Sequence, residues 1–302
     1  MSQAPYENIV IAGATASGKS ALAVALAERF GGAVVNADAL QVYDCWRILT
    51  ARPDDADLAR APHHLYGHIP ADATYSVGHW LREVAEVPRP EGPLIFTGGT
   101  GLYLSALTRG LAEIPPIPPT IRAEGDRLRA GGLEAFRTYL ATHDPVMYQR
   151  VDRANGMRLQ RAWEVHRTTG TALSDWQRNQ PKALIPNDTT LHVVLFFDPS
   201  VLAERIAMRF RRMVQAGVLD EVAAQRSGWD PTLPSSRALG AAPLLEHLEG
   251  RLTLQEAEEQ AVVSSRQYAK RQRTWFRSNM PDWIRINGDR EPIQDVMKVM
   301  IN

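Results

Sequence analysis

The stretch NIVIAGATASGKSALAVALAERF, Asn8 to Phe30, decides the fold of this chain. An apolar run, a glycine-framed loop ending in Lys-Ser and an alanine-rich amphipathic segment follow one another in it. The pattern predicts a short strand at residues 9–12, a helix at 19–30 and a second strand at 33–36. This strand–helix–strand order is typical of an α/β fold with a parallel sheet.

Two further strands are expected later in the chain. The apolar residues 93–96 precede the glycine-rich TGGTG, and HVVLFFD, residues 192–198, is dominated by β-branched and aromatic side chains. A helix-compatible segment follows TGGTG, and from Pro199 the pattern is helical nearly to the end. We therefore predict a parallel sheet covered by helices on both faces, with helices at the C-terminus.

Two proline-bearing stretches, EIPPIPPT (113–120) and PKALIPND (181–188), bracket a segment with helical patterns and no convincing strand. Proline disfavours helix at the preceding residue and stiffens the chain, so both stretches are interpreted as hinges. We predict a core formed by residues 1–114 and 190–302, interrupted by an inserted, mainly helical domain at 115–189.

Composition and charge restrict the class of protein. The formal net charge of the 302 residues is zero, so a nucleic-acid partner would have to be held by a local basic patch. The single cysteine, Cys45, excludes an intrachain disulfide and a cysteine-based zinc site. The first residues lack a cationic start and an apolar run, and no later run is long enough to span a bilayer. We expect a soluble cytoplasmic protein that does not bind a membrane.

The loop GATASGKS fits the P-loop pattern and lies between the predicted strand and helix, the context that the pattern requires. Its glycines allow backbone N–H groups to face one anion, and the helix N-terminus adds partial positive charge. Lys19 would reach terminal phosphate oxygens, and the Ser20 hydroxyl would ligate Mg²⁺. A tight turn without a ligand is the alternative. The residues expected to bind a diphosphate here are Gly13, Ala14, Thr15, Ala16, Ser17, Gly18, Lys19 and Ser20.

A P-loop indicates a bound diphosphate but does not identify ATP. A nucleotide hydrolase or kinase usually adds an acidic metal ligand at the end of an apolar strand. The strand at 93–96 instead precedes Thr97, Gly98 and Gly99, and only VVNAD offers a carboxylate at a strand end, in Asp38. A metal-binding role for Asp38 therefore stays open, while the pattern disfavours a nucleotide hydrolase.

Eight motifs occur in one order along the chain: GATASGKS, NADALQVY, ILTARP, PHHL, YS, GGTGLYLSAL, RAWEVHRTTG and AKRQRTWFR. With them, almost the whole chain resembles the tRNA dimethylallyltransferases, also called tRNA isopentenyltransferases. The resemblance implies a P-loop core with an inserted helical domain. It also implies transfer of the dimethylallyl group of dimethylallyl diphosphate to N6 of adenosine 37, the nucleotide 3′ to the tRNA anticodon.

The same resemblance implies the catalytic residues. Asp38 matches the family's catalytic aspartate, which would accept the N6 proton, and Thr100 matches a threonine near the reacting atoms. The alternative for Thr100 is a turn that only brings strand and helix close. A diphosphate-binding arginine falls at Arg205 or Arg209, of which Arg205 is favoured, and solvated helix charges are the alternative for both.

Contacts with tRNA are implied at several places. Gln41 offers a bidentate contact to an adenine edge, while Ala39 and Leu40 depart from the family's usual residues. Arg266, Lys270, Arg273 and Arg277 form one stripe on a helix, which binds RNA phosphates or is a solvated face. The complete set matched to tRNA contacts is Asp38, Ala39, Leu40, Gln41, Thr100, Arg122, Arg158, Gln160, Arg161, Arg237, Gly240, Arg266, Lys270, Arg273 and Arg277.

Two other functions remain as alternatives: an adenylate (free-nucleotide) isopentenyltransferase and a P-loop small-molecule kinase. The basic C-terminal helix and the insertion favour tRNA over a free nucleotide, and a monomer is expected. A metal site at His63 and His64 is rejected, because adjacent side chains diverge and no third ligand stands at suitable spacing. Loop packing or phosphate contact is expected for these histidines instead.

Overall fold

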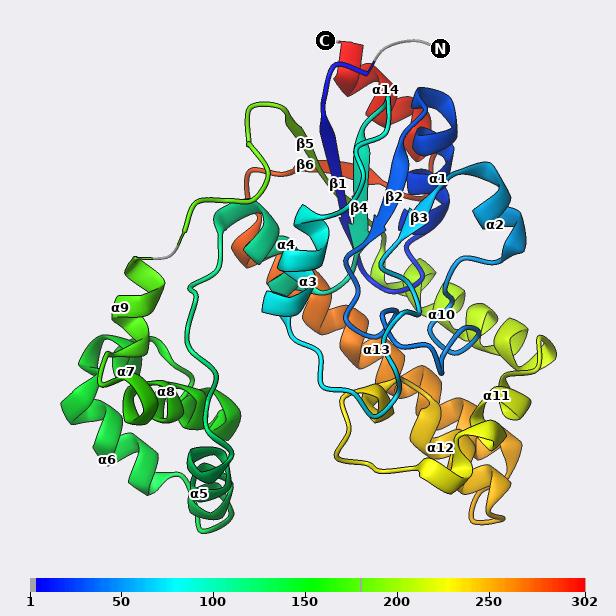
Figure 1. The fold of residues 1–302 in the computed structure, drawn as a ribbon. Helices are drawn as coiled ribbons and strands as arrows, with labels where there is room; N and C mark the ends of the chain where they lie inside the picture. The colour runs from blue at the N-terminus through cyan, green and yellow to red at the C-terminus, as the bar shows by residue number, and fades with distance from the viewer. Residues whose placement is uncertain (1–3, 180, 302) are drawn as a thin grey trace. The chain divides into compact units, whose positions relative to one another are not determined.

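The computed structural model describes residues 4–179 and 181–301. In it, strand β1 (Asn8–Gly13) is buried along its whole length and lies in the middle of the sheet. The predicted ends of the core, residues 1 and 302, lie outside the described residues. The sheet order is β3-β2-β4-β1-β5-β6, and every pairing is parallel. The other strands are β2 (Ala33–Asn36), β3 (His63–His64), β4 (Leu94–Gly98), β5 (Thr190–Phe196) and β6 (Ile284–Asn287). The predicted α/β fold with a P-loop core is confirmed (Figure 1).

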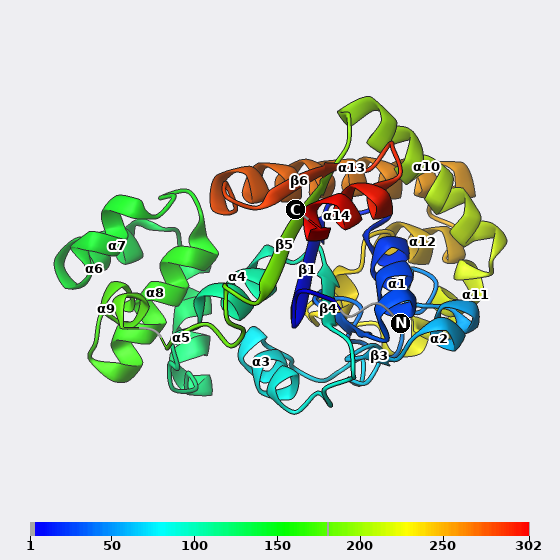
Figure 2. The ribbon, with the colours of Figure 1, turned by 90° about the horizontal axis from the view of Figure 1, so that it is seen from above.

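Alternating residues of β1 enter two different hydrophobic clusters. Ile9 and Ile11 pack with α1 (Lys19–Phe30) and α14 (Pro292–Ile301), whereas Val10 and Ala12 pack with α3 (Val77–Ala85) and α4 (Gly101–Arg109). Because side chains of a strand alternate between faces, helices cover both faces of the sheet (Figure 2). The expected covering on both sides is therefore present.

A third hydrophobic cluster lies beyond the carboxyl ends of the strands. Residues of the loop after β2, including Trp46 and Leu49, pack there against helices that follow β5. These helices are α10 (Pro199–Gln215), α11 (Val218–Ala224), α12 (Ala241–Leu248) and α13 (Leu254–Asn279). Short 3₁₀ turns occur among them at Arg226–Gly228 and Ser235–Arg237. The loop after β2 also contains a short helix, α2 (Asp55–Arg60). The packing fixes α10 and α13 over the end of the sheet where β1 and β4 stop.

The chain divides into two compact units, and the second, Arg109–Ala183, is helical and has its own core. Its helices are α5 (Pro119–Ala130), α6 (Glu134–His143), α7 (Pro145–Arg150), α8 (Gly156–Thr169) and α9 (Leu173–Arg178). It begins and ends earlier than the predicted 115 and 189. Ile114 and Ile117 pack within this unit, whereas Ile185 is buried in the core of the first unit. Packing, and not the proline content of the hinges, sets the boundaries.

Candidate active site

The loop from β1 to α1 forms an anion nest, defined here as residues Gly13–Ser20. Gly13 is required by close approach, because a Cβ there would lie 2.5 Å from Ser17 Oγ. Ala16 and Gly18 adopt left-handed backbone conformations, with φ of 63° and 78°. Gly18 is the N-cap of α1 and provides no side-chain cap, so the first N–H groups of the helix stay available for an anion.

A pocket of about 380 Å³ opens over the nest. Of the residues predicted to bind a diphosphate, those that line it are Thr15, Ala16, Ser17, Gly18, Lys19, Ser20, Arg205 and Arg209. Gly13 and Ala14 are buried below and shape the turn. The pocket wall also contains Asp38 and Gln41, so the structure brings the predicted carboxylate and the predicted anion site together.

Lys19 is the cation at the start of α1. The pKa of Lys19 is lowered to about 8, chiefly by burial; the nearby Asp38 carboxylate raises this pKa and Arg209 lowers it. The ammonium group is therefore costly to keep charged without an anion beside it. A bound diphosphate would supply that anion.

Arg205 and Arg209 both reach the nest from α10, where they are one turn apart. The Arg205 Nε–H donates to Ala16 O at 2.9 Å, and its guanidinium carbon lies 4.8 Å from the centre of the Phe197 ring. The Arg209 Nη1–H donates to Thr15 Oγ1 and its Nη2–H to Thr50 O, each at 3.2 Å. Burial lowers the pKa of Arg209, which Asp38 opposes. Both arginines line the pocket, and the preference for Arg205 stays a prediction.

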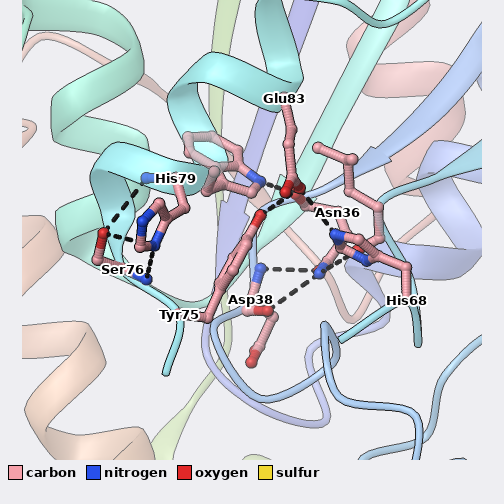
Figure 3. A network of polar contacts seen from close by, with 9 residues as sticks. Asn36, Asp38, His68, Tyr75, Ser76, His79 and Glu83 are labelled. Carbon is pink, nitrogen blue, oxygen red and sulfur yellow. Dashed lines mark hydrogen bonds and ion pairs between the residues drawn. The ribbon is translucent and has the colours of Figure 1, made fainter. Parts of the chain in front are cut away.

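Asp38 follows β2, and its backbone is held by the side chain of Asn36. Asn36, which is fully buried, accepts the Asp38 N–H at 2.8 Å and donates to Asp38 O at 3.0 Å and to Leu65 O at 2.9 Å. The Asp38 Oδ1 accepts the Leu40 N–H at 3.0 Å. Figure 3 shows Asn36 and Asp38 joined in this way. The side chain of Asn36 thus closes the turn that points Asp38 into the pocket.

Helix α3 supports this turn from behind. The Trp80 Nε1–H donates to Asn36 O at 2.7 Å. Glu83 Oε2 accepts the Tyr75 hydroxyl at 2.6 Å and contacts His68 Nε2 at 2.7 Å, which ties the loop after β3 to the helix (Figure 3). Burial is the main reason that the pKa of Tyr75 is raised, and Glu83 raises it further. The network fixes helix α3 and the loop after β3 next to the turn that carries Asp38.

Thr100 holds the backbone next to Asp38, and Gln41 holds the loop at Thr50 and Ala51. The Thr100 Oγ1 accepts the Ala39 N–H at 3.0 Å, so this hydroxyl orients the Asp38 segment through its main chain. Gln41 Nε2 donates to Thr50 O and Ala51 O, both at 2.9 Å. Because both amide hydrogens are used, the adenine contact of Gln41 would require these bonds to be exchanged. That contact stays a prediction.

A smaller pocket of about 60 Å³ shares Thr15, Asp38, Thr50 and Arg209 with the first. Its apolar wall is formed by Leu40, Leu49, Ile206, Phe210, Met213 and Leu239. Leu40, one of the departures from the family pattern, therefore faces this pocket. An apolar pocket next to an anion site fits a molecule with one charged and one hydrocarbon end.

Helix α13 carries the predicted basic stripe. Arg266, Lys270 and Arg277 are exposed and Arg273 is partly exposed. The opposite face of α13 packs inward, where Trp275 lies so close to Gly101 that a Cβ at this glycine would be 2.4 Å from its ring. The expected division into a basic and an aromatic face is present.

Gln272, on the same inward face, was not identified from the sequence. It is buried, its Oε1 accepts the Thr15 N–H at 2.9 Å, and its Nε2 donates to Gly99 O at 2.9 Å. It thus connects the nest with the turn before Thr100. Only the motif AKRQRTWFR marked this segment, and the spacing of its charges drew attention to the other face.

The helical unit contains four of the residues matched to tRNA contacts: Arg122, Arg158, Gln160 and Arg161. Gln160 is buried, and its Nε2 donates to Asp126 Oδ1 and Glu164 Oε1, both at 2.9 Å. As found, Gln160 has a structural role between α5 and α8, and its predicted RNA contact would need these bonds to open. Arg122, half-exposed, lies 3.4 Å from the buried Glu164 carboxylate.

Arg158 and Arg161 differ in their surroundings within α8. Arg158 is exposed, whereas burial lowers the pKa of Arg161 and the nearby Glu164 raises it. Both guanidinium groups carry positive charge at neutral pH, since arginine does not lose its proton in proteins. Their contacts with RNA stay predictions.

Arg237 and Gly240 lie before α12. Arg237 is exposed, while Gly240 is buried with a φ of 94° and would place a Cβ 2.8 Å from the Phe210 ring. A backbone requirement is thus enough to explain this glycine. Its predicted contact with tRNA would have to be made by the backbone.

His63 and His64 form β3, which pairs in parallel with β2 at the edge of the sheet. The His63 Nδ1 lies 2.8 Å from Ala61 O. The two histidines therefore lie in a short edge strand and not in a loop, while the expected phosphate contact stays a prediction. Two residues gave too short a pattern for a strand to be predicted.

Comparison with known proteins identifies relatives over most of the chain. A family profile described as IPP transferase matches residues 41–279. A protein of Dinoroseobacter shibae named tRNA dimethylallyltransferase is 53% identical over 275 residues, which cover 91% of this chain and 93% of that protein. The structure of the full-length tRNA isopentenylpyrophosphate transferase of Bacillus halodurans has a TM-score of 0.68 at 27% identity, covering 98% of this chain and 95% of the other. A eukaryotic dimethylallyltransferase described as acting on tRNA shares the fold, with a TM-score of 0.79 at 24% identity, over 93% of this chain and 73% of its own.

Proposed function

Because this chain belongs to the IPP transferase family, we propose that it transfers the dimethylallyl group of dimethylallyl diphosphate to N6 of adenosine 37 of a tRNA. The observation that carries the proposal is that the anion nest and Asp38 line one pocket, with an apolar pocket beside them. The diphosphate would lie on the nest and the five-carbon chain against Leu49, Ile206 and Phe210.

In the reaction the bond between the allylic carbon and the diphosphate oxygen breaks, and a bond from N6 to that carbon forms. The N6 proton passes to the Asp38 carboxylate, which acts as general base. Lys19, Arg205, Arg209 and the nest amides stabilise the negative charge that grows on the leaving diphosphate. Thr100 and Asn36 hold the Asp38 backbone while the proton moves.

Mg²⁺ fits the oxygen donors of this pocket. The Ser20 hydroxyl and the Asp38 carboxylate both line it, and such oxygens are ligands that Mg²⁺ accepts. Ser20, together with diphosphate oxygens, would hold the ion, which supplies further positive charge against the leaving group.

The tRNA would be bound by the exposed basic stripe of α13 and by the arginines of the helical unit. The stripe follows one helix face, so successive phosphates can be met along it. Extrusion of the target base costs on the order of a few kcal/mol, which such backbone contacts offset. Among residues 4–179 and 181–301 no helix has the length and apolar character needed to cross a bilayer.

Incubation with labelled dimethylallyl diphosphate and unmodified tRNA tests the proposal. We expect label in the RNA at a single adenosine and release of inorganic diphosphate. Label in added AMP but not in tRNA would indicate the free-nucleotide enzyme, and turnover of ATP without transfer of label would indicate a kinase. The relatives carry the name of the tRNA enzyme and support neither alternative.

A further inference from the structure

Gln272 occupies a position that the basic stripe of α13 does not explain. Lys270 and Arg277 on the same helix are exposed, but the Gln272 side chain is only 5% exposed. Both functional groups of its amide are used across long sequence separations, one on the nest and one on the turn after β4. A buried amide with two distant main-chain partners fixes their separation, because either bond is costly to lose.

The turn after β4 is shaped to receive this amide. A Cβ at Gly99 would lie 2.1 Å from the Gln272 Nε2, so any side chain at this position would displace the amide. Thr100, the next residue, accepts the Ala39 N–H beside Asp38. The amide of Gln272 therefore helps to position the Asp38 segment, through its bond to Gly99 and through the adjacent Thr100.

On its other side the amide fixes the nest. Thr15, whose N–H it accepts, is also the residue whose hydroxyl accepts Arg209. Tyr268, one turn earlier on α13, adds to the same bridge, since hydrogen bonds with Thr100 and Gln272 oppose the rise in its pKa that burial causes. The inner face of α13 thus holds both halves of the site.

We propose that Gln272 is a positioning residue that sets the distance between the anion nest and the Asp38 segment, and that it does not bind tRNA itself. This inference rests on the proposed transfer reaction for its kinetic consequence only. The bridge determines how far the donor carbon lies from the proton acceptor, and small displacements of reacting groups reduce rates strongly.

The test compares Gln272→Leu, which has a similar size and no hydrogen bonds, with Gln267→Leu on the exposed face of α13. We expect Gln272→Leu to lower kcat/KM for dimethylallyl diphosphate by at least about tenfold, and to weaken binding of inorganic diphosphate. Its Kd for tRNA should stay within about twofold of wild type, since the exposed stripe is unchanged. The control should match wild type in all three measurements.

Gln272→Glu provides a readout that a purely structural role would not give. A protonated carboxyl group reproduces the donor and the acceptor of the amide, whereas a carboxylate would face the Gly99 carbonyl. The transfer rate of this variant relative to wild type should therefore rise as the pH is lowered from 8 to 6. A flat ratio overturns the proposal even if Gln272→Leu does not fold.

Two further results would also overturn it: unchanged donor kinetics in Gln272→Leu, or a loss of tRNA affinity comparable to the loss in rate. Failure of the proposed function gives a different pattern. In that case wild type itself transfers no label to tRNA, while binding of inorganic diphosphate to wild type and Gln272→Leu still tests the bridge.

Discussion

At the scale of single residues, Asp38 lines the pocket over the anion nest and is surrounded by groups that orient it. Its backbone is held by Asn36 and its Oδ1 by the Leu40 N–H. We predict that Asp38→Asn keeps the affinity for inorganic diphosphate but lowers the transfer rate at saturating substrates by a factor on the order of 10²–10⁴, the range for loss of a general base. Single-turnover rates with labelled donor measure the effect. An unchanged rate would remove Asp38 from proton transfer.

Lys19 gives the site a pH dependence of definite sign. The pKa of Lys19 is lowered to about 8, chiefly by burial, and in the proposed reaction the charged form binds the diphosphate. Affinity should therefore be complete below pH 8 and decrease as the pH rises through 8. We predict that the Kd for inorganic diphosphate rises several-fold between pH 7 and 9. Lys19→Arg, whose side chain stays charged, should be weaker overall but lack this step; the same step in that variant would assign it to another group.

The residues found from the sequence and those missed differ in how far away their partners lie. Lys19, Ser20 and Asp38 stand in local patterns, strand–loop–helix or strand end, whose chemistry is readable without the fold. Gln272 meets Thr15 and Gly99 only after the whole sheet has formed. Its hydrogen bonds have no local signal, because a buried and an exposed glutamine look alike in a helical sequence.

At the scale of elements, α11 fixes the loop after β2 through Glu221. Its carboxylate accepts three successive backbone N–H groups, from Arg47 to Leu49. These bonds hold the turn whose next residue, Thr50, accepts Arg209 through its carbonyl. The contact joins the apolar pocket wall to the arginine of the anion site.

We predict that Glu221→Ala lowers the free energy of unfolding by about 3 kcal/mol, because charge-assisted hydrogen bonds to several amides are lost. Donor KM should rise several-fold as Arg209 loses its partner. Denaturant unfolding and donor titrations measure both quantities, with Asp220→Ala, an exposed neighbour on α11, as the control. Equal stability of Glu221→Ala and the control would contradict this role.

The exposed stripe of α13 predicts a second effect that is confined to RNA. Lys270→Ala should weaken tRNA binding and lower the slope of log Kd against log salt by about one unit, since one phosphate contact is lost. Donor KM should not change. Arg29→Ala, an exposed cation at the end of α1, is the matched control. A salt slope equal to that of wild type would make the stripe a solvated face.

Elements with strong local patterns were predicted well, and edge elements were not. The helix at 19–30 and the strand at 33–36 have the expected bounds, and β4 and β5 lie within about two residues of theirs. The edge strands β3 and β6 were missed, since both are short and β6 follows a long helical region. Their pairing with β2 and β5 is decided by tertiary contacts, which local propensity does not encode.

At the scale of the whole molecule, the helical unit has the properties of an insertion that folds by itself. Phe136, Leu140 and Leu159 are fully buried among residues of this unit alone. The chain leaves and returns at one place, because the Leu184 N–H donates to Leu107 O at 3.1 Å. Gly110, with a φ of 90°, is needed there, as a Cβ would lie 1.9 Å from Pro181 O. The contact between Leu107 and Leu184 lies within the first unit, so the core can form it without the insertion.

We therefore predict that replacing Arg109–Ala183 with a short glycine linker leaves the first unit folded, because closing so short a gap costs little entropy. The shortened chain should melt cooperatively and bind inorganic diphosphate with an affinity within a few-fold of wild type, since the nest lies in the first unit. Transfer to tRNA should fall at least tenfold through a higher KM for tRNA, as the cations of the insertion are lost. Isolated Arg109–Ala183 should in turn bind tRNA weakly and in a salt-dependent manner. Full transfer by the shortened chain would show that the insertion does not bind the substrate, and loss of diphosphate binding would show that the two units do not fold independently.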